Sequence, residues 1–361
     1  MRKLLLILIT FFSPLLGQLS QGNACASETH QFVTFSIDKN IYAQINEDQQ
    51  EKLLQRLNDL NFFIEEKVKT KIPAYLEERL KSLSLRVSLT DKPGRDGLFI
   101  PQTGSEHVIS IQLNQVYSNG IYALLAHEIF HALHYQINPD EMVWIREGLA
   151  QLFEFITTGE LNGMNLLAAI NNPMTPLLGN YTLENKNAAQ YGHNQLYFYY
   201  LYSHCGEADL FWKITAGNSE EKNLRGSYLI DNVLQQMNSK KSECKNFTES
   251  AISFEVAKLH NEVQFSSEEG RNEGNKYFII GSDITPRLPV AQSASQLKVI
   301  IQKMPLLSSF KMPLKKFKEY KGSCQNCAFY YAKNEFPYTV TETIPLDIKN
   351  IDIILVKLSA D

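Results

Sequence analysis

The sequence predicts an α+β fold, in which a small sheet and long helices form one domain and a smaller β-rich domain follows. Alternating apolar and polar residues over 83–89 are typical of a half-buried strand, because successive strand side chains point to opposite faces. Over 47–69 apolar residues recur every three or four positions, which predicts an amphipathic helix. Beyond about residue 245 short β-prone runs replace the helical pattern, so we expect a separate β-rich module over 245–361.

The beginning of the chain has the pattern of a secretory signal peptide. A basic start precedes the apolar run 4–17, and small residues surround Cys25 before a polar segment. We expect residues 1–26 to be cleaved near Ala26, which would make the mature protein exported, either periplasmic or secreted. The apolar run is too short to form a stable membrane span. The alternatives are an uncleaved anchor and a bacterial lipid anchor at Cys25.

Three strands and one helix are expected in the first part of the mature chain. The strands cover residues 32–37, 83–89 and 108–113, where apolar residues are continuous or alternate with polar ones. The helix over 47–69 follows Asn46, and asparagine caps helix N-termini well. These elements make up the small sheet and its first helix.

Three long helices are expected after the strands. The first covers about 121–136 and ends at Asn138 and Pro139, because the residue before a proline disfavours the helical conformation. The second runs over about 142–157 and the third over about 188–204, each stopping close to a glycine. In the C-terminal module the β-prone runs are 297–301, 328–331 and 344–358.

Residues 127–131 read His-Glu-Ile-Phe-His, a spacing that suits a metal site. On a helix His127 and His131 lie one turn apart on the same face, so both imidazoles can reach one cation. Glu147, sixteen positions after His131, would supply the third ligand from the next helix. Three protein ligands leave the fourth zinc position open for water and substrate, which is the arrangement of a catalytic site. We therefore expect one Zn²⁺ per chain and no other cofactor.

The segment that contains Glu147 resembles one found in a known group of enzymes. The run Trp-Ile-Arg-Glu-Gly-Leu-Ala over 144–150 is similar to the W-x-x-E-G-[LF]-A segment that carries the third zinc ligand in aminopeptidase-like enzymes. With its HExxH helix, the chain resembles the gluzincin zinc metallopeptidases, the clan of thermolysin and the aminopeptidase N relatives, over about residues 80–215. The resemblance implies a zincin-like metallopeptidase domain over 27–244 that hydrolyses a peptide or protein substrate. We find no upstream Gly-x-Met-Glu-Asn, the segment that binds a substrate's free amino terminus in aminopeptidases, so an endopeptidase is favoured.

The resemblance and the chemistry of the side chains assign roles to the other site residues. Glu128 would act as general base on zinc-activated water. Glu154 lies two turns after the third ligand on the same helical face, where it suits a hydrogen bond to a ligand histidine; a solvent-exposed glutamate is the alternative. Tyr191 is the expected donor to the oxyanion, with His193 as the alternative and simple packing as the other interpretation. The strand over 108–113 would be the edge strand that pairs with extended substrate.

Charge and cysteine content restrict the partners and the compartment. The net charge is −4 at pH 7, and loss of residues 1–26, with two cations and no acid, would make it −6, so no nucleic-acid partner is expected. Four of the five cysteines lie beyond residue 26, and an even number in an exported protein suggests two disulfides. Proximity favours the pairs Cys205–Cys244 and Cys324–Cys327; half of a metal site or a redox pair is the other interpretation of the second.

Two alternative functions belong to other classes. One is a catalytically inactive binding module that keeps a zincin fold, and the intact set His127, Glu128, His131 and Glu147 argues against it. The other is an envelope assembly factor or chaperone with structural zinc, but a structural site is normally closed by four protein ligands. Hydrolysis of unfolded casein with and without a zinc chelator separates both from a peptidase.

Overall fold

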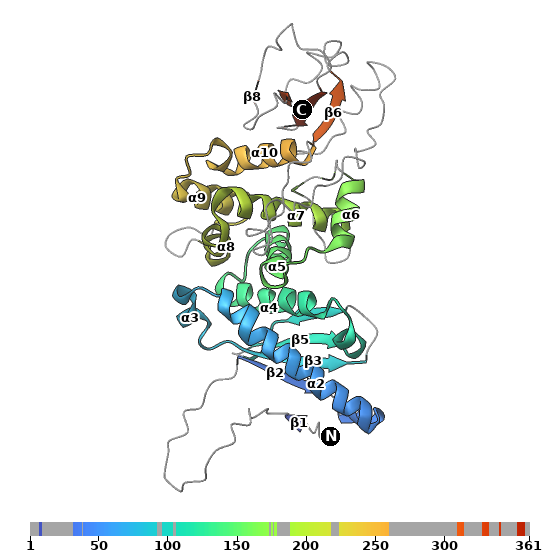
Figure 1. The fold of residues 1–361 in the computed structure, drawn as a ribbon. Helices are drawn as coiled ribbons and strands as arrows, with labels where there is room; N and C mark the ends of the chain where they lie inside the picture. Colours follow the sequence, from blue (N-terminus) through green and yellow to red (C-terminus); the bar gives the residue numbers. More distant parts are fainter. Residues whose placement is uncertain are drawn as a thin grey trace. The chain divides into compact units, whose positions relative to one another are not determined.

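The computed structural model of the 361-residue chain (Figure 1) divides into two compact units. Residues 1–139 and 153–160 form the first unit, and residues 140–152 and 161–361 form the second, so one long helix contributes to both. Helices and a mixed sheet occur together in the first unit, which confirms the α+β class. The structure describes residues 7–8, 32–37, 39–91, 96–103, 106–172, 175, 177–178, 188–217 and 224–259, and the strand residues 309–313, 327–331, 339–340 and 352–357.

The first unit contains a five-stranded sheet in the order β1-β2-β3-β5-β4. β2, β3 and β5 are parallel, and β1 and β4 pair antiparallel at the two edges. The alternation seen in the sequence becomes alternating burial along β3 and β5, whose apolar side chains enter the core. The strands are β1 (Ile7–Leu8), β2 (Val33–Ile37), β3 (Ser84–Thr90), β4 (Gly97–Ile100) and β5 (Glu106–Gln112).

One prediction about this sheet is wrong. The sequence places the strand over 108–113 at the edge, but β5 lies between β3 and β4, so the edge position belongs to β4. Residue 113 already begins the 3-10 turn Leu113–Tyr117. Alternating apolar and polar residues indicate that one face of a strand is buried. They do not indicate whether the strand pairs with one neighbouring strand or with two. β4 itself has only four residues and no alternating burial, so the sequence pattern does not reveal it.

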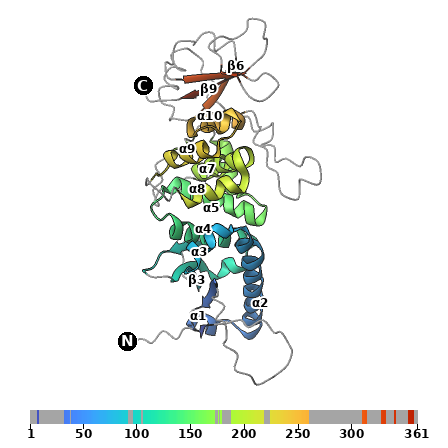
Figure 2. The same ribbon diagram turned by 90° about the vertical axis from the view of Figure 1, so that its left-hand side faces the viewer.

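Helix α2 (Glu47–Phe63) covers one face of the sheet: it crosses in front of the strands in Figure 1 and stands beside them in Figure 2. A capping box begins it, because the side chain of Asn46 accepts the Gln49 N–H (2.9 Å) and that of Gln49 accepts the Asn46 N–H (3.0 Å). Leu53, Leu57 and Leu60 of the predicted apolar stripe are buried, together with Phe63. Shorter helical segments of this unit are α1 (Lys39–Gln44), the π-helical turn Ile64–Val68, the 3-10 turn Lys69–Lys71 and α3 (Ala74–Leu80).

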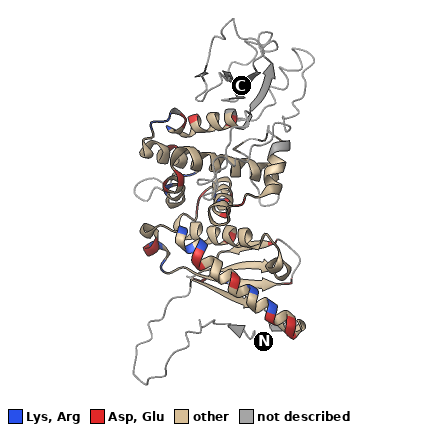
Figure 3. Cartoon of the chain, in the orientation of Figure 1, with Lys and Arg blue, Asp and Glu red and all other residues tan. Residues whose placement is uncertain are grey.

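The exposed side of α2 carries charges of both signs along its length (Figure 3). Lys52 and Asp48, one turn apart, form an exposed ion pair with an N–O distance of 2.7 Å. Such pairs are typical of a solvated helix face and contribute little to stability. Among the helices that the structure describes, none combines the length and the apolar character needed to cross a membrane.

The second unit contains a helix that is buried on nearly all sides. In α7 (Ala188–Leu201) all but two residues are buried, among them Tyr197, Tyr199 and Tyr200. A helix buried on all sides has no polar face, which explains why its tyrosines occur around the whole circumference. The other helical segments of this unit are α6 (Gly163–Asn171), the π-helical turn Tyr202–Gly206, α8 (Glu207–Ala216), α9 (Ser227–Met237), the 3-10 turn Ser242–Cys244 and α10 (Phe247–Leu259).

A disulfide joins the segment that follows α7 to the segment that precedes α10. Cys205 and Cys244 are bonded with an S–S distance of 2.05 Å, which confirms this predicted pair. The neighbouring His204 stacks on Tyr200 with ring centroids 4.5 Å apart. Burial lowers the pKa of His204 below its ordinary value of 6.5. Cys324, one half of the other predicted pair, lies outside the described residues.

Four short strands form an antiparallel sheet near the C-terminus, in the order β6-β9-β7-β8. The predicted runs 328–331 and 344–358 correspond to β7 and β9, whereas 297–301 lies outside the described residues. The prediction of β structure from residue 245 onward is corrected by α10, which packs on α7 through the hydrogen bond between Ser250 and Tyr197 (2.8 Å). The strands are β6 (Ser309–Pro313), β7 (Cys327–Tyr331), β8 (Thr339–Val340) and β9 (Asp352–Lys357).

Candidate metal centre

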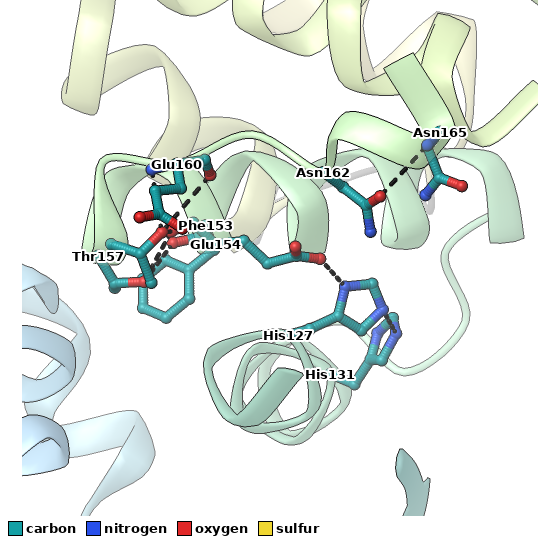
Figure 4. Close-up of polar contacts among 9 residues, drawn as sticks. His127, His131, Phe153, Glu154, Thr157, Glu160, Asn162 and Asn165 are labelled. Atoms are coloured by element: carbon teal, nitrogen blue, oxygen red, sulfur yellow. Dashed lines mark hydrogen bonds and ion pairs between the residues drawn. The ribbon is translucent and has the colours of Figure 1, made fainter. Parts of the chain in front are cut away.

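Helix α4 (Ile121–Ile137) carries the two histidines of the motif, and α5 (Val143–Thr158) follows it. α4 ends before Pro139, as the sequence predicts. One helical turn separates His127 from His131, so their rings lie side by side (Figure 4). The ring planes are 87° apart and the two Nε2 atoms are 3.0 Å apart. Each imidazole therefore directs one nitrogen toward a shared point.

A carboxylate completes a group of three side chains. One ligand atom from each of His127, His131 and Glu147 lies within 4.8 Å of the other two, and all three residues are half-buried. Zinc takes imidazole nitrogens and carboxylate oxygens in tetrahedral sites with bonds of about 2.0 Å. Two nitrogens of such a site are about 3.3 Å apart, close to the 3.0 Å between the Nε2 atoms. The donor set and the spacing of its two nitrogens therefore fit a metal ion.

Glu154 contacts one of these histidines from α5. Its Oε1 lies 2.6 Å from Nδ1 of His127 (Figure 4), and its side chain is buried, which does not fit a solvent-exposed glutamate. When Nδ1 donates its hydrogen to this carboxylate, the lone pair of Nε2 stays available for a metal. Phe153, the preceding residue, packs on Phe130 of α4 with ring centroids 5.2 Å apart. This packing holds the second half of α5 against α4.

Glu128 lies next to His127 in the sequence but outside the group of three ligands. Neighbouring helix positions differ by about 100° around the axis, so this glutamate points in another direction from the histidine. Its side chain is buried, and its Oε2 accepts a hydrogen bond from the backbone N–H of Phe99 in β4 (2.6 Å). The carboxylate of Glu128 is thus free of the ligand group and can act as a base, whereas the carboxylate of Glu147 can bind the metal.

Helix α7 packs against α5 next to Glu147. The side-chain amide of Asn194 donates to the carbonyl oxygen of Trp144, with an N–O distance of 3.2 Å. One turn further along α5, Phe198 covers Gly148 so closely that a Cβ there would lie 2.2 Å from the ring. The glycine that follows Glu147 in the sequence therefore allows the two helices to approach.

The two candidate oxyanion donors have different surroundings. Tyr191 is half-buried and precedes Asn194 by three residues, so it continues the face of α7 that contacts α5. His193 is fully buried, and its Nε2 lies 3.1 Å from the carbonyl oxygen of Asn172 at the end of α6. This contact gives His193 a packing role between α6 and α7.

Two contacts of the site were not predicted from the sequence. The bond from Phe99 to Glu128 uses a backbone N–H, which every residue except proline has, so no residue pattern indicates it. The close packing at Gly148 could have been expected from the sequence. Glycine lowers helix stability, so a glycine inside a helix and next to a proposed ligand indicates a close contact at that position.

No protein-family model matches this chain, and no curated protein matches it either.

Proposed function

We propose that the protein is an exported, zinc-dependent peptidase that holds one Zn²⁺ per chain. The main support for this proposal is that the ligand atoms of His127, His131 and Glu147 lie close together, while Glu128, which follows His127 in the sequence, stays outside the ligand group. A set of three protein ligands leaves a coordination position for water and substrate. A zincin-like domain is the fold that this arrangement favours, within the α+β class that the elements define.

The chain's own residues supply the remaining steps of hydrolysis. A bound zinc ion would supply Lewis-acid activation of water and of the scissile carbonyl group. Glu128 accepts a proton from the attacking water and delivers it to the leaving amine. Glu154 holds the imidazole of His127 in one tautomer and one orientation. Tyr191 donates its hydroxyl hydrogen to the oxyanion.

Tyr191 is a better donor than His193 because of accessibility. A group that acts on substrate has to reach the site, and Tyr191 is half-buried whereas His193 is fully enclosed and bonded to Asn172. Removal of the tyrosine hydroxyl should therefore affect turnover without affecting the packing of α6 on α7.

We propose an endopeptidase rather than an aminopeptidase. The chain lacks a Gly-x-Met-Glu-Asn segment with which to bind a free amino terminus. β4 ends the described sheet, and an edge strand can bind an extended peptide through backbone groups without requiring a chain end. The substrate class that follows is an extended segment of a peptide or an unfolded protein.

Casein hydrolysis tests this function. The mature chain should hydrolyse unfolded casein, a zinc chelator should abolish the activity, and Glu128→Gln should retain zinc while losing about 10²- to 10⁴-fold in turnover. Glu78→Gln, the same change at an exposed position of α3, is the matched control and should behave as wild type. Zinc-loaded wild-type protein without hydrolysis would leave a binding module or an assembly factor as the function instead.

A further inference from the structure

We propose that the backbone N–H of Phe99 positions the carboxylate of Glu128, which makes Phe99 a positioning residue of the reaction. The inference rests on the proposed peptidase function, and it concerns only residues of the first unit. Phe99 donates to Oε2 of Glu128 at 2.6 Å, and the side chain of Glu128 is 6% exposed. A hydrogen bond to a buried carboxylate is short and stronger than one between neutral groups.

The pairing of β4 leaves this N–H available. The N–H of Gln112 donates to the carbonyl oxygen of Asp96 (3.1 Å), so residues 96 and 112 form a hydrogen-bonded pair. In an antiparallel ladder, hydrogen-bonded positions alternate with positions whose backbone groups point away. From the register, Leu98 pairs with Ser110, and the N–H of Phe99 therefore faces away from β5. It points instead to the helix that carries Glu128.

Two contacts fix the distance between β4 and α4. At Gly97 a Cβ would lie 2.8 Å from Leu124 and 3.1 Å from Oε1 of Glu128, so the strand approaches the helix as only glycine allows. Two residues later, the ring of Phe99 packs against Tyr135 of α4, with ring centroids 5.7 Å apart. Tyr135 and Glu128 are seven residues apart and lie on the same face of α4.

A third ring supports the phenylalanine from the sheet. His107 of β5 lies edge-on to the rings of both Phe99 and Tyr135, with centroid distances of 5.7 Å and 5.5 Å. The Nδ1 of His107 accepts the backbone N–H of Gln102 (3.1 Å), which fixes the imidazole. The side chain of Phe99 thus places the strand, and its N–H holds one oxygen of Glu128.

The functional consequence is an orientation of the base. With Oε2 held by Phe99, rotation of the carboxylate is restricted and Oε1 is the oxygen presented for proton transfer. Misplacement of a catalytic group by about 1 Å costs on the order of 100-fold in rate. Loss of this one N–H should therefore lower kcat by about 10- to 100-fold, with little change in KM or in zinc content.

Two substitutions at position 99 separate the N–H from the ring. Phe99→Ala removes the ring and keeps the N–H, whereas Phe99→Pro removes both; edge strands tolerate proline where the N–H points away from the ladder. We expect kcat of Phe99→Pro to be about 10- to 100-fold below that of Phe99→Ala, at equal zinc content. Equal kcat values for the two variants would overturn the proposal.

Amide hydrogen exchange tests the same contact without using catalysis. In the wild-type protein the Phe99 amide should exchange slowly, although it lies outside the ladder. Glu128→Ala should make it exchange rapidly, Glu128→Gln should preserve much of the protection through its amide oxygen, and the Leu98 amide should stay protected in all three. Protection of Phe99 that survives Glu128→Ala would overturn the proposal. Wild-type protein without zinc-dependent hydrolysis would overturn the peptidase function, while the exchange rates would still decide whether the contact exists.

Discussion

Gly148→Ala adds one methyl group at the contact between α5 and α7. The new Cβ would lie 2.2 Å from Cδ2 and 2.5 Å from Cε2 of Phe198, whereas carbon atoms in contact are normally about 3.5 to 4.0 Å apart. Phe198 is 1% exposed, so its ring has no solvent to move into. Overpacking of this kind costs about 3 kcal/mol, and the higher helix propensity of alanine returns about 1 kcal/mol. The net loss of stability should be about 2 kcal/mol.

Urea unfolding of the metal-free protein measures this effect, and zinc titration measures its consequence for the site. Gly148→Ala should lower the unfolding midpoint and weaken zinc binding, because Glu147 is the adjacent residue and moves with the helix. Gly163→Ala is the matched control, since a Cβ at Gly163 meets no atom within 4 Å. A Gly148→Ala protein as stable as the Gly163→Ala protein would refute the argument that this glycine is required by the close approach of Phe198.

Three further predictions follow from individual contacts. Glu154→Gln removes the anionic partner of His127 and should weaken zinc binding by about 10- to 100-fold in a chelator competition; unchanged affinity would show that the contact does not support the ligand. Tyr191→Phe should lower kcat by about 10- to 1000-fold with zinc content and KM nearly constant; wild-type kinetics, together with a collapse in His193→Ala, would transfer the role to His193. Because burial lowers the pKa of His204, its imidazole binds a proton less readily in the folded state than in the unfolded state. The contribution of neutral His204 to the free energy of unfolding is therefore full above pH 6.5 and is lost as the pH falls below 6.5. The Tm of the wild type should therefore fall more steeply on acidification than that of His204→Gln, and equal slopes would contradict this assignment.

Elements with a strong period and clear ends could be predicted from the sequence. α2 has one apolar stripe and a capping box at Asn46, and α4 stops before Pro139, so pattern and end signals agree. The spacing of His127, His131 and Glu147 selected the three residues whose ligand atoms converge. Which side chains share one face of a helix depends only on their spacing in the sequence, so the ligand residues could be recognised without knowing the fold.

Features that depend on neighbours in space could not be predicted in the same way. The position of β5 inside the sheet depends on β4, which is too short to show a period. The helix α10 falls within a segment read as β-rich, because its packing on α7 is a tertiary contact that no local pattern reports. The bond from Phe99 to Glu128 joins a backbone group to a side chain 29 positions away.

Elemental analysis of the purified mature protein is the most direct test of the metal site. The wild type should hold about one zinc per chain after dialysis, and both His131→Ala and Glu147→Gln should lose most of it, because each removes one of three protein ligands. Glu128→Gln should keep its zinc, since Glu128 lies outside the ligand group. Absence of zinc from the wild type, or undiminished zinc in His131→Ala, would contradict the proposed metal centre.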